Sequence, residues 1–472
     1  MPTMRRDAAG ILLRDVEVHP HGARADCRIR RGRVAQIGHE LRPAPGELVI
    51  GGDGGALLPG LADHHLHLTA TAARETSLDV SALSRGELAA ALAGADPGED
   101  GWVRVVGHDE VAHGDLHRDT LDACRGSVPM RLQHRSGALW SVNSAGLARL
   151  GADHASHAGI ERDREGRPTG RLWRADRWLR DVLDARPPSL RSLGARLAAL
   201  GLTHVADATP DATAAEAAFA AVRGGELPQY VMVMAEGAGA PRHPRLSVGP
   251  VKVVVTDHEL PDLDDLTGRI ARAHAVGRAV AVHCVSRVAL ALTLAALDQA
   301  GVCDGDRVEH GAVVDPATAK ELARRGVRVV TQPTLVALHG DDYWQRAEPC
   351  DRVDLWRYGT LVRAGVRVAP SSDAPYGDLD PWACLRAAAG RHTPSGRVLG
   401  PDERLPARDV LRGMLAPLDD PGGPPRRIAV GSAADLVLLD RPLTDALRAP
   451  HARHVRATLI AGQLVYCADG RD

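Results

Sequence analysis

The sequence predicts the α/β fold class, with a (β/α)8 barrel and a small β-sandwich domain built from both chain ends. Three observations lead to this prediction. The chain has 472 residues, more than one ordinary domain needs. Eight apolar, strand-like segments alternate with helical stretches through its middle. Its two ends carry short alternating segments that are typical of antiparallel strands.

The eight strand-like segments define the predicted barrel. Stretches rich in Ala, Leu and Arg separate most of them, as in RVALALTLAALDQAG, and eight βα units are the number that closes a TIM barrel. The segments are 56–62, 202–208, 230–234, 251–255, 279–285, 306–310, 327–332 and 366–370. In such a barrel the active residues lie at the carboxyl ends of the strands.

The remaining segments define the other parts of the chain. Residues 1–57 and 425–472 are expected to fold together, because either end alone has few strands to cover a core. The barrel then occupies 58–424. The interval after its first strand is too long for one helix, and it holds extra strands such as WVRVVGHD and VPMRLQH. We expect an insertion at about 70–200, over the barrel mouth, where loops commonly shape a substrate site.

Composition excludes several classes of protein. The formal net charge of −2 argues against a protein that binds nucleic acid or an anionic membrane. The seven scattered cysteines include no C-x-x-C pair, which argues against a disulfide framework or a Cys-rich zinc module. No stretch approaches the ~18 apolar residues that a membrane span needs. We therefore expect a cytoplasmic protein.

Polar residues that could bind a metal recur at the ends of the predicted strands. His65 and His67 alternate in LADHHLHL, so both side chains point the same way. His283 follows AVAV, His310 ends DRVEH, and Asp373 closes VRVAPSSD. A single histidine at a strand end is usually a hydrogen-bonding residue. Four histidines and one aspartate at the same rim indicate a divalent metal site, most simply for zinc.

Lys252 lies inside the fourth predicted strand, PVKVVV. It is one of only two lysines, with Lys320, whereas arginine supplies all the other basic residues. An edge lysine that reaches solvent is the ordinary interpretation. Burial beside metals, however, depresses a lysine pKa toward the neutral amine, which can add carbon dioxide and form a carbamate. Arginine cannot do this chemistry.

These residues and motifs resemble the amidohydrolase superfamily, and within it the branch of N-substituted formamide deformylase and related amide hydrolases. The shared motifs run from LPGLADHHLHL through RVEHG and APSSDAPYGDLDPW to GSAADLVLLD. The resemblance implies that His65 and His67 hold one metal and that His283 and His310 hold another. It also implies that a carboxylated Lys252 bridges the two metals, and that Asp373 binds the first metal and shuttles protons. Spacing alone would also allow a single zinc.

The substrate residues depart from the common pattern of that branch. Relatives often have H-x-x-G-D after the fifth strand, whereas this chain reads HCVSR, so Arg287 replaces a carboxylate. Further candidate substrate contacts are loop residues that follow predicted strands, or residues that flank the motif SGALWSVNS, in which Ala138 replaces a histidine that is common in relatives. They are His108, Asp109, Arg135, Trp140 and Tyr376, and the ordinary interpretation of each is a structural loop residue rather than a substrate contact.

The sequence thus predicts a metal-dependent hydrolase of a C–N amide bond, with Asp373 and Lys252 as catalytic residues. The substrate would be an N-acyl or N-formyl amine, a cyclic amide or a peptide-like amide, and one option is the tailoring of a modified peptide or secondary metabolite. Two alternatives are a hydrolytic deaminase with one metal and a catalytically silent barrel that acts as a binding protein. We expect a small-molecule or peptide-like partner, no nucleic acid, no membrane, and a homodimer as one option.

Overall fold

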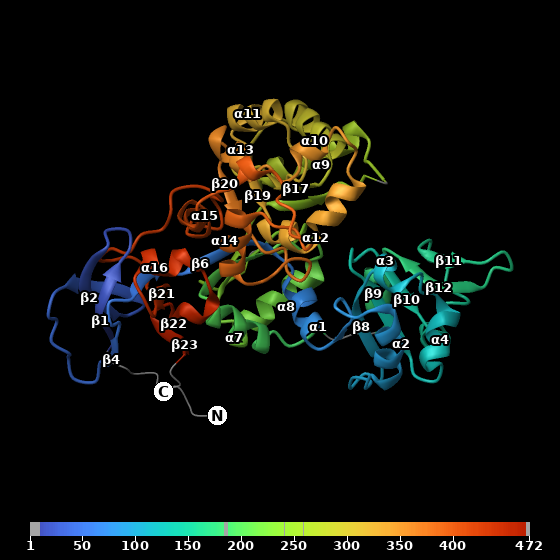
Figure 1. Cartoon of the computed structure of the whole chain (residues 1–472), viewed down its shortest axis with the longest axis horizontal. Coiled ribbons are helices and arrows are strands. Elements are labelled where there is room, and N and C mark those ends of the chain that lie inside the picture. Colours follow the sequence, from blue (N-terminus) through green and yellow to red (C-terminus); the bar gives the residue numbers. More distant parts are fainter. Residues whose placement is uncertain (1–9, 184–186, 240, 258, 469–472) are drawn as a thin grey trace. The chain divides into compact units, whose positions relative to one another are not determined.

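A computed structural model describes residues 10–183, 187–239, 241–257 and 259–468. The chain splits into two compact units (Figure 1). Unit 1 comprises Met1–Thr69 and Ser189–Asp472, and unit 2 comprises Ala70–Pro188. Within the described residues no helix is both long and apolar enough to cross a membrane. Residues 1–9 and 469–472 of the predicted terminal domain lie outside the described residues.

Strands from both ends of the chain form one sheet in unit 1. The amino-terminal strands are β1 (Ile11–Val18), β2 (Ala23–Arg30), β3 (Arg33–Gly38), β4 (Leu48–Gly51) and β5 (Ala56–Pro59). The carboxyl-terminal strands are β21 (Leu436–Leu439), β22 (Val455–Ile460) and β23 (Gln463–Cys467). The order is β23-β22-β21-β5-β1-β2-β3, with β4 paired to β1. Leu57 of β5 lies opposite Leu438 of β21, and both are fully buried, so the two ends share one core. The packing of these strands as two layers stays a prediction.

Two further sheets of unit 1 are entirely parallel. The first has the order β15-β14-β13-β6, from β6 (Leu61–Leu66), β13 (Leu202–Asp207), β14 (Tyr230–Val233) and β15 (Leu246–Val248). The second runs in sequence order through β16 (Val251–Val254), β17 (Val280–Cys284), β18 (Arg307–His310), β19 (Arg328–Thr331) and β20 (Val368–Pro370). Backbone hydrogen bonds connect the two sheets at two places. Lys252 N–H donates to Met234 C=O and Asp373 N–H donates to His65 C=O, each at 2.8 Å.

One predicted strand was wrong in its bounds. The segment 56–62 contains two strands, because β5 belongs to the terminal sheet and β6, which carries His65, starts only at Leu61. Gly60 lies between them, where a Cβ would stand 2.1 Å from Thr203 Oγ1 of β13. This close approach requires glycine, and Pro59 ends β5 without an N–H to continue the pairing. The short strand β15 was not predicted.

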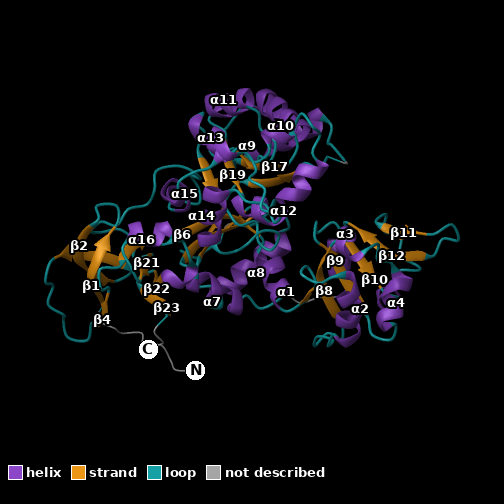
Figure 2. Ribbon diagram, in the orientation of Figure 1, coloured by secondary structure: helices purple, strands orange, loops and turns teal. Residues whose placement is uncertain are grey.

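Helices follow most of the parallel strands of unit 1 (Figure 2). The helices of this unit are α7 (Arg191–Ala199), α8 (Ala212–Arg223), α9 (Leu263–Ala275), α10 (Arg287–Ala300), α11 (Pro316–Arg325), α12 (Pro333–Arg346), α13 (Tyr358–Arg363), α14 (Pro381–Gly390), α15 (Ala407–Met414) and α16 (Leu443–Arg448), with 3-10 turns η1 (Arg352–Asp354), η2 (Pro401–Glu403) and η3 (Ala452–His454). Several begin at a side-chain cap. Asp262, Ser286 and Asp315 accept backbone N–H groups in the first turns of α9, α10 and α11. Such caps fix where the helix starts after each strand.

Unit 2 is built around a mixed sheet of order β11-β12-β10-β9-β8-β7. Its strands are β7 (Leu78–Asp79), β8 (Val103–His108), β9 (Met130–His134), β10 (Leu139–Val142), β11 (Ile160–Arg162) and β12 (Pro168–Trp173). Its helices are α2 (Arg85–Gly94), α3 (Glu110–His113), α4 (Arg118–Arg125), α5 (Ser144–Leu150) and α6 (Asp176–Leu183), while α1 (Leu68–Glu75) spans the boundary. The predicted insertion extended to about 200. The compact unit ends at Pro188, because α7 buries Leu193 and Leu197 in unit 1.

Candidate metal centre

Two histidines at the end of β6 face the carboxylate that follows β20. His65 Nε2 lies 3.3 Å from Asp373 Oδ1, and His67 Nε2 lies 3.4 Å from the same oxygen. Ligand atoms of these three residues all lie within 4.8 Å of one another, and His65 and Asp373 are buried. Two imidazoles and one carboxylate at this spacing can hold a single divalent cation.

The other three predicted ligands adjoin this group. Lys252 Nζ of β16 lies 3.4 Å from His65 Nε2. The His310 ring at the end of β18 has its centroid 5.1 Å from that of His65 and 4.5 Å from that of His283 on β17. The structure therefore brings all six predicted ligands into one cluster, from strands that are far apart in the sequence.

Backbone conformation at two strand ends directs side chains into the cluster. His310 and Asp373 both have positive φ angles, 72° and 54°, which non-glycine residues rarely adopt. Along a regular strand, neighbours such as Glu309 and His310 point to opposite faces. The left-handed turn at His310 lets both side chains face His65. Strain of this kind is typical of functional sites, because the surrounding structure must hold it in place.

Each of three histidines has a side-chain partner at Nδ1. His65 Nδ1 contacts Glu309 Oε2, His67 Nδ1 lies 3.1 Å from Thr209 Oγ1, and His310 Nδ1 lies 2.8 Å from Gln332 Oε1. These contacts leave Nε2 of each ring as the atom available for a metal. Partners of metal-binding histidines characteristically fix the ring orientation in this way.

Burial governs the charge state of the cluster. It lowers the pKa of His65 to about 3, with a further contribution from Lys252, and it lowers the pKa of Lys252 against the attraction of Glu309 and Asp373. Burial alone would raise the pKa of the Asp373 carboxyl, but the neighbouring histidines outweigh it and hold that pKa well below its usual range. Neutral imidazoles around an ionised carboxylate are the forms that bind a cation.

Glu309, Thr209 and Gln332 were missed in the sequence analysis. Glu309 had a visible signal, since it precedes His310 in RVEHG and shares a strand face with Arg307. Burial by itself would raise the pKa of Glu309, but Arg307 and His65 hold it well below its usual range. No comparable signal marks Thr209 or Gln332, because a polar residue after a strand is common.

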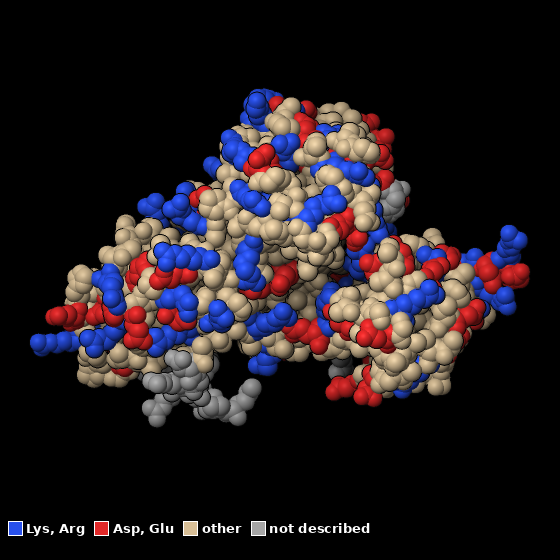
Figure 3. Space-filling model, in the orientation of Figure 1, with Lys and Arg blue, Asp and Glu red and all other residues tan. Residues whose placement is uncertain are grey.

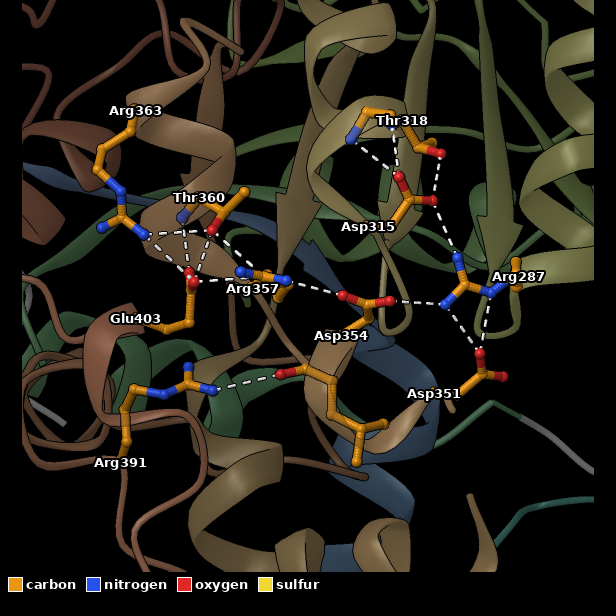
Figure 4. Close-up of polar contacts among 12 residues, drawn as sticks. Arg287, Asp315, Thr318, Asp351, Asp354, Arg357, Thr360, Arg363, Arg391 and Glu403 are labelled. Atoms are coloured by element: carbon orange, nitrogen blue, oxygen red, sulfur yellow. Dashed lines mark hydrogen bonds and ion pairs between the residues drawn. The ribbon is translucent and has the colours of Figure 1, made fainter. Parts of the chain in front are cut away.

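Two predicted substrate residues lie in unit 1 at different places. The Tyr376 ring meets the His67 ring edge-on, with centroids 5.7 Å apart, so it adjoins the metal cluster. Arg287 starts α10, and its guanidinium points toward three aspartates (Figure 4). Its nitrogens lie 2.9, 2.8 and 2.6 Å from the carboxylates of Asp315, Asp351 and Asp354. In this arrangement Arg287 ties α10 to the segments before α11 and around η1.

The other four predicted substrate residues lie in unit 2, where each has an internal partner. His108 Nε2 contacts Gly114 C=O at 3.0 Å, and Trp140 Nε1–H donates to Asp176 at 2.9 Å. Asp109 caps α3 and lies 3.1 Å from Arg135 Nε. These contacts support the fold of unit 2, and a role in substrate binding stays a prediction.

Comparison with known proteins gives consistent results along the whole chain. A sequence model described as "Amidohydrolase family" matches residues 49–466. The N-substituted formamide deformylase of Arthrobacter pascens is 26% identical over 98% of this chain and 99% of its own length. The YtcJ protein of Bacillus subtilis (strain 168) is 25% identical over 88% and 89%, respectively. The resemblance inferred from the sequence is therefore confirmed.

Solved structures show the same fold. A metal-dependent hydrolase from Pyrococcus horikoshii OT3 superposes with a TM-score of 0.75 at 20% identity, over 96% of this chain and 99% of that one. A metal-dependent hydrolase from Pyrococcus furiosus superposes with a TM-score of 0.71 at 22% identity, over 92% and 99%. At this identity the likeness concerns the fold alone.

Proposed function

Because this chain belongs to the amidohydrolase family and is a metal-dependent hydrolase of carbon–nitrogen bonds, we propose that it cleaves an amide bond. The substrate class is an N-acyl or N-formyl amine, a cyclic amide or a peptide-like amide. The convergence of His65, His67 and Asp373 carries this proposal, because it supplies a cation site and an ionised carboxylate at one point.

The fold that supports this site is proposed to be a closed barrel. The eight strands would be β6, β13, β14, β16, β17, β18, β19 and β20, with β15 at the edge of one sheet. The two backbone hydrogen bonds that join the sheets support closure, since one lies at each seam. Both involve residues of the cluster, Lys252 at one seam and Asp373 at the other. The predicted barrel domain of 58–424, with its insertion, and the composite terminal domain are part of the same proposal.

The residues fit two divalent metals, most simply zinc. His65, His67 and Asp373 would hold the first, and His283 and His310 would hold the second. Lys252 would serve both as a carbamate formed from carbon dioxide. Its burial and its lowered pKa favour the neutral amine that this addition needs. When bound, the metals would polarise the substrate carbonyl and acidify the attacking water.

Asp373 is the proposed proton carrier of the reaction. Its carboxylate is ionised and lies beside the imidazoles of His65 and His67, so it can accept the proton that the attacking water loses. It would then pass this proton to the amine nitrogen as the C–N bond breaks. Since the carboxylate leaves the cycle unchanged, one residue serves both as general base and as general acid.

Two measurements test this function. One is the metal content of the protein and its activity with and without metal, and the other is the effect of replacing each of the two lysines. We expect about two metals per chain, loss of amide hydrolysis after chelation, and recovery when zinc is restored. One metal with deaminase activity would favour the mononuclear alternative. Absence of metal and of turnover would favour a silent binding protein.

The Lys252→Arg variant keeps the charge but cannot form a carbamate. We expect it to lose the carbamate carbon signal in 13C NMR with labelled bicarbonate, and to lose most activity. Lys320→Arg is the matched control, because Lys320 is exposed on α11, and it should behave as wild type. Wild-type turnover in Lys252→Arg would remove the lysine from the mechanism.

The remaining predictions concern partners and location. Positive and negative side chains are interspersed on the face drawn in Figure 3, which supports a small-molecule rather than a nucleic-acid partner. The cytoplasmic location, a homodimer and a role in secondary metabolism stay predictions.

A further inference from the structure

Arg307 and Glu309 form a buried ion pair that contacts His65 at Nδ1. We propose that Glu309 and Arg307 are positioning residues that hold His65 in the tautomer and orientation needed to bind a metal through Nε2. This inference rests on the proposed function, because it assumes that His65 is a metal ligand.

The geometry of β18 places both residues against β6. Arg307 and Glu309 are two positions apart on the strand, so their side chains share one face. Glu309 Oε2 contacts His65 Nδ1, and Glu309 Oε1 accepts from Arg307 Nε–H at 2.6 Å. Glu309 is fully buried, and Arg307 and His65 are 2% and 1% exposed. Glu309 thereby links a strand of one parallel sheet to a strand of the other.

The chemistry of the partner distinguishes His65 from the other ligand histidines. An ionised carboxylate only accepts hydrogen bonds, so Glu309 requires the proton of the His65 ring to be on Nδ1 and leaves the Nε2 lone pair for a metal. A carboxylate also makes the ring a stronger ligand. The hydroxyl of Thr209, which contacts His67, can also donate and so imposes neither condition as strictly. Gln332 Oε1, which contacts His310, accepts as Glu309 does but carries no charge, so it sets the tautomer without making the ring a stronger ligand to the same degree.

Arg307 makes a buried carboxylate tolerable at this position. An unpaired buried charge is strongly destabilising, whereas a hydrogen-bonded pair offsets much of the desolvation cost. Arg307 Nη2 also donates to His64 C=O at 3.2 Å and lies 3.1 Å from Met234 Sδ. Arg307 therefore contacts the β6 backbone next to His65 while it holds Glu309, so the pair and the ligand form one connected unit.

The test compares zinc binding by the full-length chain in which either of two buried glutamates is changed to glutamine. In Glu309→Gln we expect the zinc affinity, measured by competition with a chromogenic chelator, to fall about 10- to 100-fold. Glu403→Gln is the matched control. Glu403 is 3% exposed and pairs with Arg357 and Arg363 (Figure 4). We expect Glu403→Gln to lower the thermal stability about as much as Glu309→Gln does, but to leave the zinc affinity unchanged.

A second readout separates positioning from general stability. The visible absorption bands of bound Co²⁺ report the ligands directly, and we expect them to shift in Glu309→Gln but not in Glu403→Gln. Equal zinc affinity in Glu309→Gln and wild type would overturn the inference, whereas failure of the wild type to bind zinc would overturn the proposed metal centre instead.

A third variant keeps the test decisive if Glu309→Gln does not fold. Glu309→Asp retains the charge opposite Arg307 but shortens the side chain by one methylene, so it loses the direct contact with His65. We expect a smaller loss of zinc affinity, about 10-fold. Wild-type affinity in Glu309→Asp would show that the contact with Nδ1 is unnecessary and would also overturn the inference.

Discussion

The two units of this chain each contain a cluster of histidines, but the ring nitrogens are used differently. In unit 1 the Nδ1 atoms of His65, His67 and His310 face side chains, and the rings gather around Asp373. In unit 2 the His108 ring lies 5.7 Å from that of His113 and 5.6 Å from that of His134, so these rings also adjoin one another.

In the unit 2 cluster, both ring nitrogens of His113 and of His134 contact neighbouring groups of the same unit. His113 Nε2 contacts Leu83 C=O at 2.9 Å, and its Nδ1 accepts from Asp109 N–H at 3.1 Å. His134 contacts Ser136 through Nδ1 and Glu110 through Nε2. Within the described residues, only the unit 1 group has ligand atoms close enough for one metal. Proximity of imidazoles is therefore insufficient, and convergent nitrogens beside an ionised carboxylate are what make a metal site.

The largest expected effect concerns the carboxylate of each cluster. We expect Asp373→Asn to reduce amide hydrolysis about 10²- to 10⁴-fold, the usual contribution of a proton carrier. Glu110→Gln, which alters the carboxylate beside His134, should retain activity within about 3-fold. Turnover would be measured with whichever member of an N-formyl and N-acyl amine panel the wild type hydrolyses. Similar losses of turnover in both variants would contradict the inference that only the unit 1 cluster takes part in catalysis.

A second expected effect concerns one histidine from each cluster. His67→Ala should weaken zinc binding by more than about 100-fold, since it removes a proposed ligand rather than a partner of one. His113→Ala should leave zinc affinity unchanged and lower the free energy of unfolding by about 1–3 kcal/mol, because it removes two hydrogen bonds from a buried site. Competition titration and urea unfolding measure the two quantities. A loss of zinc by His113→Ala would count against the assignment.

A third expected effect concerns buried histidines of unit 1 outside the proposed ligand set. Burial and Arg307 lower the pKa of His64 to about 3, and burial and Arg426 lower that of His204 well below 6.5. The unfolded chain then binds more protons, so this stability is present above pH 6.5 and is lost as the pH falls from there. We expect about 2 kcal/mol per histidine to be lost at pH 5.

Urea unfolding of the metal-free protein between pH 7.5 and 5 measures this loss, and His204→Gln should reduce it. Asp63 contributes with the opposite sign, because burial raises its pKa to about 6. Burial also raises the pKa values of Asp176, Asp207, Asp380 and Asp435, whereas it lowers those of His65, His283 and His310, which add to the loss of stability toward low pH. Stability that stays constant or rises toward pH 5 would contradict the expectation.

The smallest expected effect concerns Arg287. Arg287→Ala should lower the free energy of unfolding by about 1–2 kcal/mol, since three aspartates lose a shared cation. Arg324→Ala is the control, because Arg324 pairs with Glu321 at the surface and such pairs contribute at most about 1 kcal/mol. An increased KM at unchanged stability would instead favour the predicted substrate contact.

Much of the candidate site could be predicted because chemistry and strand ends are both visible in a sequence. His65, His67, Lys252, His283, His310 and Asp373 each follow or lie within an apolar segment, and parallel strands bring their carboxyl ends to one edge. The scarcity of lysine singled out Lys252 without any structure. The division of 56–62 into β5 and β6 was not visible, because it depends on how closely Gly60 approaches Thr203.

The sequence by itself thus determined the family, the order of the strands and the residue types that can bind a metal. Only the tertiary structure decided which ring nitrogens face the candidate metal site and which form hydrogen bonds with other groups. Glu309 contacts His65 from another sheet, Gln332 contacts His310, and His113 and His134 of unit 2 form hydrogen bonds within their own unit. The physical reason is that a hydrogen bond depends on distances of a few tenths of an ångström between residues far apart in the chain, which periodicity and composition do not specify.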